Sequence, residues 1–244
     1  MDLMARMHLH RPAIQILKRY HRLTISIDAP TLRSPVLFVA NHGFGSVFDL
    51  NVYATLAALD HLKLDRPVTA LVHQLGWRIG LGPAFEYFGG LPASPASAKT
   101  AFELGHHVLV FPGGDLDGFK AHRDRDKIVF SGRTGFAKIA RAHGVPVVPI
   151  VTAGAGDTVW VFSDGHKIAK ALRFDHRLRL KGLPISLAAP WGLNLGVAGF
   201  APYLPFPARL STKVLTPMHA LPEESTQDFA DRVEAAMQAA LDAL

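Results

Sequence analysis

The residue types and spacing best suited to chemistry in this 244-residue chain are His42 and Asp49. They follow the apolar run 35–40, which is typical of a buried strand, so His42 falls where that strand ends. Loops at strand ends are where a rigid scaffold presents catalytic groups. A histidine there, with a carboxylate in reach, is a candidate general base, because the carboxylate orients the ring and stabilises the imidazolium.

The spacing of His42 and Asp49 requires the chain to fold back between them. Seven residues of continuous helix would separate the two side chains by about 10 Å, which is too far for a hydrogen bond. Gly43 and Gly45 permit a turn of this kind. Structural alternatives stay open: segment 46–49 fits a capping box with Asp49 at the third helical position, and His42 fits a structural histidine at a strand end.

The composition excludes several kinds of site. The chain has no cysteine, which excludes disulfides, zinc–thiolate sites and cysteine nucleophiles. It also lacks the serine-hydrolase elbow, the Walker phosphate loop and the dinucleotide fingerprint. Its thirteen histidines show no ligand spacing, so we predict no metal site. The first residues lack the long apolar core of a secretory signal, so we expect a cytoplasmic location.

Strand-like and helix-like segments alternate along the chain. We expect strands at 24–28, 36–40, 68–72, 85–88, 108–111, 145–151 and 159–162, and helices at 12–23, 47–60, 74–82, 95–105, 134–143 and 223–244. This alternation predicts an α/β fold with a largely parallel central sheet flanked by helices. Irregular connections indicate a mixed sheet, and the length favours one domain, 1–244.

The net charge of +6 is unevenly placed. Segment 1–23, an expected basic helix, carries five Lys/Arg and one acidic residue. Segment 166–181 carries six Lys/Arg and one acidic residue, whereas segment 220–244 carries one basic and six acidic residues. This distribution suits a negatively charged partner on one side of the molecule.

Segment 182–208 contains no charged residue, and its five prolines argue against one continuous spanning helix. We expect an apolar loop or hairpin that dips into an anionic membrane surface beside the basic stretch. The alternative is a buried, irregular core segment.

Three segments together resemble the lysophospholipid acyltransferase (glycerolipid acyltransferase, PlsC-like) superfamily. They are VLFVANHGFGSVFD at 36–49, HVLVFPGGDLDGFK at 107–120 and GVPVVPIVTAGAGDT at 144–158. Segment 127–140 is most similar to the branch of monoacylglycerol and diacylglycerol acyltransferases and their bacterial relatives. The resemblance covers 36–158, and more weakly 183–207.

The resemblance implies an O-acyltransferase with a glycerolipid acyltransferase fold. It would move a fatty acyl group from acyl-CoA or acyl-carrier protein to the hydroxyl of a mono- or diacylglycerol or a lysophospholipid, without a bound cofactor. His42 and Asp49 correspond to the family's catalytic pair, although six residues intervene here instead of the usual four. Phe-Pro-Gly-Gly at 111–114 corresponds to the block that shapes the acceptor site, in the form seen in the neutral-glycerolipid branch, and 145–149 to the apolar block near the acyl chain.

This chemistry needs donors for a tetrahedral oxyanion. The backbone N–H groups of Gly113 and Gly114 are candidates, because glycine allows close approach, and Asp115 is placed to face the acceptor. Alternatively, the glycines only form a tight turn and the aspartate is a local cap.

A cluster of cations is the candidate site for the donor's phosphates. Its members are Lys120, Arg123, Lys127 and Arg133, with Arg125 between them. Arg133 precedes a predicted helix start, where anions are also favoured. Because Asp124 and Asp126 alternate with these cations, a self-paired, solvated surface is the alternative.

Other functions stay open at this stage. A lipid-binding or transfer protein would use the apolar segment without catalysis, and a thioesterase-like hydrolase would use the same histidine. Nucleic-acid binding is disfavoured, because stretch 166–181 offers only Phe174 for stacking and shows no recognised module. We therefore expect a lipid acceptor, an acyl thioester and an anionic membrane as partners, with attachment to the inner face of the membrane.

Overall fold

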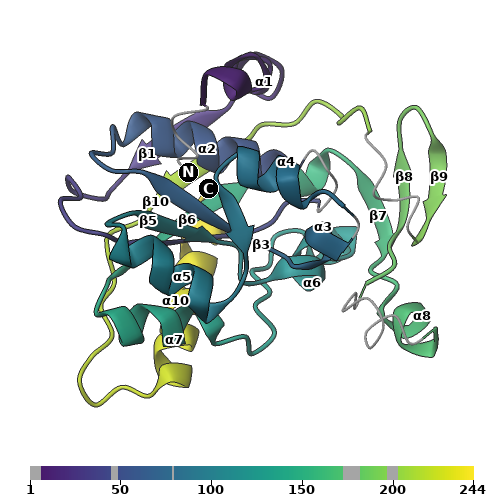
Figure 1. Ribbon diagram of the computed structural model, residues 1–244. Helices are drawn as coiled ribbons and strands as arrows, with labels where there is room; N and C mark the ends of the chain where they lie inside the picture. The colour runs from purple at the N-terminus through teal and green to yellow at the C-terminus, as the bar shows by residue number, and fades with distance from the viewer. Residues whose placement is uncertain (1–6, 45–48, 79, 173–181, 197–202) are drawn as a thin grey trace.

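The computed structural model describes residues 7–44, 49–78, 80–172, 182–196 and 203–244, and a seven-stranded sheet forms its centre (Figure 1). The strand order is β1-β10-β6-β2-β5-β3-β4. The strands are β1 (Thr24–Ile27), β2 (Leu37–Ala40), β3 (Val68–Val72), β4 (Gly90–Pro92), β5 (His107–Val110), β6 (Val147–Ala153) and β10 (Ser211–Val214). Only the β10–β6 pair is antiparallel within this sheet, so the predicted mixed, largely parallel α/β fold is confirmed.

Helices cover both faces of this sheet (Figure 1). On one face lie α1 (Met7–Tyr20) and α2 (Leu50–His61), and on the other lie α5 (Pro95–Glu103), α7 (Gly135–His143) and α10 (Thr226–Asp242). Shorter helices are α3 (Leu75–Arg78), α4 (Gly82–Tyr87), α6 (Gly114–Gly118) and α8 (His166–Ala171). The α1 and α10 helices fall within the predicted terminal segments 1–23 and 223–244, while the single-domain assignment stays a prediction.

Strand β2 is apolar throughout because both of its faces are covered. Leu37 and Val39 join the cluster beneath α5, α7 and α10, whereas Phe38 and Ala40 join the cluster beneath α1 and α2. Burial on both faces is what produces a continuous apolar run instead of an alternating one. The strand is therefore a rigid base for the loop that follows it.

A second, three-stranded antiparallel sheet stands at one end of the molecule, on the right in Figure 1. Its strands are β7 (Trp160–Ser163), β8 (Ile185–Ala188) and β9 (Gly192–Leu195), in that order. Strands β8 and β9 form a hairpin inside the apolar segment 182–208, of which residues 197–202 lie outside the described ranges. None of the helices in those ranges combines the length and apolar character needed to cross a bilayer.

Two local predictions were wrong. Residues 85–87 of the predicted strand 85–88 belong to α4, and the strand lies just beyond this helix, as β4. A short apolar run does not distinguish strand from helix, and here Pro83 in the first turn favours the helix. The capping-box alternative for Asp49, at the third helical position, was also wrong, because Asp49 is itself the N-cap of α2 and accepts a hydrogen bond from the Asn51 N–H.

Candidate active site

Asn41 fixes the end of β2 against its neighbour in the sheet. Its side-chain Oδ1 accepts from the backbone N–H of Thr152 at 2.9 Å, and its Nδ2 donates to the carbonyl of Thr152 at 3.0 Å. Thr152 lies in β6, next to β2, while β5 lies on the other side of β2. His42 therefore leaves the sheet at the carboxyl end of a central strand, where open α/β sheets carry their ligand sites.

His42 and Asp49 lie in direct contact. His42 Nδ1 is 2.6 Å from Asp49 Oδ2, and the other carboxylate oxygen accepts from the backbone N–H groups of Gly43 at 3.1 Å and Asn51 at 2.9 Å. The side chain of Asp49 is 5% exposed and that of His42 is 21% exposed. The carboxylate is thus held by the N-terminus of α2 and in turn fixes the imidazole, which leaves Nε2 for a substrate.

Gly43 makes this contact possible. A Cβ at that position would lie 2.9 Å from both Asp49 Oδ1 and the Ala155 side chain, which is closer than real Cβ atoms approach their neighbours. The predicted fold-back between His42 and Asp49 therefore depends on a glycine directly after the histidine.

The electrostatic surroundings favour a protonatable His42. Burial lowers the pKa of the imidazole, but the hydrogen bond and charge of Asp49 and the charge of Asp117 outweigh burial and the charge of Lys120. The pKa of His42 is therefore raised above its ordinary value. The imidazole therefore accepts a proton readily, and the two carboxylates stabilise its protonated form.

A pocket opens beside His42. Its lining combines polar, cationic and small apolar residues: Asn41, His42, Gly43, Phe44, Asn51, Gly118, Lys120, His122, Arg125, Thr152, Gly154, Ala155, Gly156, Val159 and Val161. The ring of Phe111 packs against the imidazole with a centroid distance of 4.8 Å. The described ranges hold no group of three His, Cys, Asp or Glu side chains suited to a metal ion. The pocket therefore places the His42 imidazole beside cationic side chains.

The predicted oxyanion residues lie in the turn into α6 and are not among the residues that line this pocket. A Cβ on Gly113 would lie 2.2 Å from the Asp117 Cβ, and Gly114 has φ +52° and donates its N–H to the Phe111 carbonyl at 3.3 Å. These contacts fit the tight-turn alternative, and the oxyanion role of the two glycines stays a prediction. Asp115 lies in α6, and its side chain is outside the described part of the structure.

The predicted phosphate-binding cations lie in different surroundings. Lys127 Nζ pairs with Asp124 at 2.6 Å, and Arg123 Nε, whose side chain is 86% exposed, lies 3.3 Å from the same carboxylate. The guanidinium of Arg133 donates to the carbonyls of Pro112 and Gly113. Lys120 alone of the four lines the pocket. Their role toward phosphates stays a prediction.

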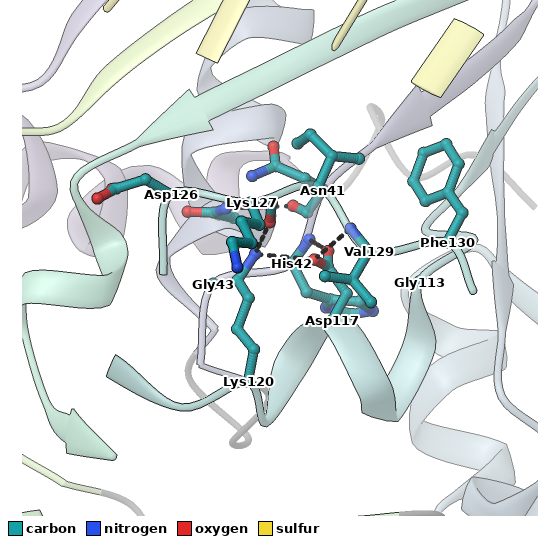
Figure 2. A network of polar contacts seen from close by, with 12 residues as sticks. Asn41, His42, Gly43, Gly113, Asp117, Lys120, Asp126, Lys127, Val129 and Phe130 are labelled. Carbon is teal, nitrogen blue, oxygen red and sulfur yellow. Dashed lines mark hydrogen bonds and ion pairs between the residues drawn. The ribbon is translucent and has the colours of Figure 1, made fainter. Parts of the chain in front are cut away.

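Asp117, two residues after Asp115, is a further residue of this site. Its fully buried carboxylate accepts from the backbone N–H of His42 at 2.7 Å, from the backbone N–H of Val129 at 3.3 Å and from Lys120 Nζ at 2.8 Å (Figure 2). The spacing of three residues between Asp117 and Lys120 was the available signal, because opposite charges at this spacing can meet across one turn of the chain.

The fold and this site define a class of α/β protein in which a histidine–carboxylate pair lies at the end of a central parallel strand. The sequence matches a family model for acyltransferases over residues 19–153 and one for diacylglycerol acyltransferases over residues 88–244. Each match covers more than half of the chain, so the chain belongs to the acyltransferases. The family predicted from the three sequence segments is confirmed.

Three relatives share parts of the sequence. The uncharacterized protein ML2427 of Mycobacterium leprae is 27% identical over 187 residues, covering 76% of this chain and 48% of the relative. A UDP-N-acetylmuramate–L-alanine ligase of Polaromonas naphthalenivorans is 31% identical over 51% of this chain and 28% of its own length. Phytyl ester synthase 1, chloroplastic, of Arabidopsis thaliana is 26% identical over 36% of this chain and 13% of its own length. The chain thus spans less than half of each relative.

A solved structure supports the same fold. It is the crystal structure of the 1-acyl-sn-glycerophosphate (LPA) acyltransferase, PlsC, from Thermotoga maritima, with a TM-score of 0.54 over 98% of this chain and 83% of that chain. The sequence identity is 15%, so this similarity confirms the glycerolipid acyltransferase-like fold and nothing finer.

Proposed function

We propose that this protein transfers a fatty acyl group from an acyl thioester, either acyl-CoA or acyl-carrier protein, to the hydroxyl of a lipid acceptor. The observation that carries the proposal is the 2.6 Å contact between His42 Nδ1 and the buried Asp49 carboxylate, at the edge of a pocket, in a chain of the acyltransferase family. This geometry supplies a fixed base for a hydroxyl, which is a poor nucleophile at neutral pH.

In the proposed reaction, His42 Nε2 takes the proton of the acceptor hydroxyl as its oxygen attacks the thioester carbonyl. Asp49 holds the ring in the tautomer that leaves Nε2 free and stabilises the imidazolium. Collapse of the tetrahedral intermediate breaks the carbon–sulfur bond, and the imidazolium returns its proton to the departing thiolate. The products are an ester and a free thiol, and no covalent enzyme intermediate is required, in keeping with the absence of cysteine.

For the acceptor we propose a neutral lipid alcohol such as a mono- or diacylglycerol, ahead of a lysophospholipid. The match to the diacylglycerol acyltransferase model over residues 88–244 and the Phe-Pro-Gly-Gly sequence at 111–114 support this choice. For the donor, the exposed Arg123 and Lys127 are the cations best placed to meet phosphates in solvent, since Arg133 already bonds to carbonyls.

The test is incubation of the protein with mixed acyl-CoAs and a panel of lipid alcohols, followed by mass spectrometry of the products. We expect an esterified lipid and free CoA in equal amounts. In His42→Ala the ester should fall by about 10²–10⁴-fold while the unfolding transition is kept. Release of CoA without ester would identify a thioesterase instead. Unchanged lipid binding without any ester from the unaltered protein would identify a lipid-binding or transfer protein.

We also propose that the protein attaches peripherally to an anionic membrane surface, on the cytoplasmic side, through the outer face of the β7–β8–β9 sheet. This outer face is defined by six apolar side chains: Trp160, Phe162, Ile185, Leu187, Leu193 and Leu195. Cross-strand pairing places them in rows, with Trp160 opposite Leu187 and Leu187 opposite Leu193, and Ile185 opposite Leu195. Five of the six side chains are exposed, and a contiguous group of exposed apolar side chains is unusual on the surface of a soluble protein.

The charge beside the outer face favours anionic lipid as its occupant. The neighbouring helix α8 exposes Lys167 and Lys170, and Trp191 lies at the β8–β9 turn. Tryptophan is favoured at membrane interfaces, and lysine near an apolar insertion adds attraction to anionic headgroups. The acceptor lipid would then be supplied from the surface on which the enzyme sits.

A further inference from the structure

Asp117 makes more contacts with other segments than a turn residue requires. Its buried carboxylate joins three segments: the loop after β2 through the His42 N–H, the segment before α7 through the Val129 N–H, and the segment just after α6 through Lys120. A buried carboxylate is costly unless it is paired and hydrogen-bonded, and here both conditions are met. The arrangement fixes the backbone of His42 and the head group of Lys120 relative to one another.

Lys120 lies in the site, although its segment of the chain is otherwise rich in surface charges. Its side chain is 10% exposed, and its Nζ donates to Asp117 Oδ1 at 2.8 Å and to the Lys127 carbonyl at 2.6 Å (Figure 2). An ammonium group has three N–H donors, and these two contacts account for two of them. Because Lys120 also lines the pocket with His42, the third donor is available to a bound substrate.

The proposed reaction needs such a donor. When the acceptor oxygen attacks the thioester, the carbonyl electrons move onto oxygen, and the resulting oxyanion requires a preorganised partner. The Gly114 N–H is already bonded to the Phe111 carbonyl, and the two glycines at 113 and 114 do not line the pocket. A charged donor in a partly buried site is a stronger partner than a neutral one.

We propose that Lys120 is the side-chain donor that stabilises this oxyanion, and that Asp117 is the positioning residue that aims it. The assignment rests on the proposed acyl transfer. The ammonium stays protonated throughout: it donates a hydrogen bond to the oxyanion as the carbon–oxygen bond forms, and releases the oxygen when the carbonyl re-forms and the thiolate leaves. His42 carries the only proton transferred.

The test compares Lys120→Met with the double variant Asp117→Asn/Lys120→Met. The double variant matters because removing the lysine alone leaves a buried carboxylate without its countercharge, whereas the pair can be removed without a net charge change. The matched control is Lys138→Met, which removes the same charge from an exposed position of α7. Folding is followed by thermal unfolding, and kinetics by ester formation with a dispersed, short-chain acceptor.

In the folded double variant we expect kcat to fall by about 10²–10³-fold with little change in KM, because the lost interaction exists only in the transition state. The control should match the unaltered protein. A rise in KM for acyl-CoA with kcat unchanged would overturn the proposal in favour of a donor-binding lysine. A kcat within threefold of the unaltered protein would overturn it, as would failure of both variants to fold, which would make the pair a folding element.

The pH profile gives a second readout, which tests whether the Lys120 charge acts on His42. The groups facing His42 are Asp49, Asp117 and Lys120, with His122 and Arg125 also lining the pocket. Lys120 lowers the pKa of His42, so Lys120→Met should move the acidic limb of kcat/KM to higher pH. If the unaltered protein forms no ester at all, it is the proposed function that fails, and the two failures are thereby distinguished.

Discussion

The loop around His42 and the outer face of the β7–β8–β9 sheet lie close together but differ in which kind of side chain is buried and which is exposed. Around His42, polar groups are buried and bonded: Asp49 uses both carboxylate oxygens and Asp117 meets three donors. On the outer face, large apolar side chains are left in solvent, with Leu193 and Leu195 each 61% exposed. Chemistry requires fixed atoms, whereas docking on a fluid surface requires free apolar area.

Strand β7 connects the two regions. Val161 is buried and lines the pocket, while its neighbours Trp160 and Phe162 are exposed on the other side of the strand. The Trp160 ring also stacks on His122, a pocket residue, at a centroid distance of 4.1 Å. Alternation along one strand thus gives one face to the reaction and the other to the proposed membrane.

The largest loss of activity is expected from substituting Asp49, which holds His42 in place. In Asp49→Asn the helix cap is kept but the charge is lost, so we expect kcat/KM to fall by about 10²–10⁴-fold with the fold intact. In Asp49→Ala the cap is lost as well, which should lower the free energy of unfolding by about 0.5–2 kcal/mol. Kinetics and denaturant unfolding check both. An Asn variant that keeps more than a tenth of the activity would contradict an orienting role.

The pH dependence of the same region is the next test. A general base must be neutral, and the pKa of His42 is raised, mainly because Asp49 and Asp117 outweigh the effect of burial. We therefore expect kcat/KM to fall about tenfold per pH unit on the acidic side, with a midpoint above the ordinary value of 6.5. In Asp49→Asn the midpoint should move to lower pH. A midpoint below 6.5 in the unaltered protein would speak against this environment.

The smallest effect is expected from altering the outer face. In Leu193→Ser/Leu195→Ser we expect binding to phosphatidylcholine–phosphatidylglycerol vesicles to weaken about tenfold or more, because two exposed leucines no longer enter the lipid. Activity on a dispersed, short-chain acceptor should be unchanged. Vesicle co-sedimentation measures the binding.

Leu104→Ser is the matched control for that experiment, since Leu104 is 65% exposed at the end of α5, away from this sheet. Equal loss in the control and the double variant would contradict the docking assignment. A lipid-independent dimer that only the double variant dissociates would show that a second copy of the chain covers the outer face.

Local patterns predicted the parts of the fold that depend on near neighbours. The apolar run before Asn41 became β2, segment 68–72 became β3 without change, and Gly144 ended α7 in the left-handed conformation that favours glycine. Where one short segment has two stable conformations, local pattern was insufficient. Residues 85–87 joined α4, because the packing of this helix against α3 and β4 decides their conformation.

The sequence by itself determined the family, the alternating α/β order, the candidate base His42 and the apolar, proline-rich segment. Each depends on residue type, short spacing or order along the chain. Only the tertiary structure decided that Asp49 meets His42, that Lys120 turns inward to Asp117 while Arg123 stays in solvent, and that Trp160 joins the β8–β9 hairpin in one surface. Spacing along the chain alone does not fix these relations, because their geometry is set by which buried groups find partners when the sheet is assembled.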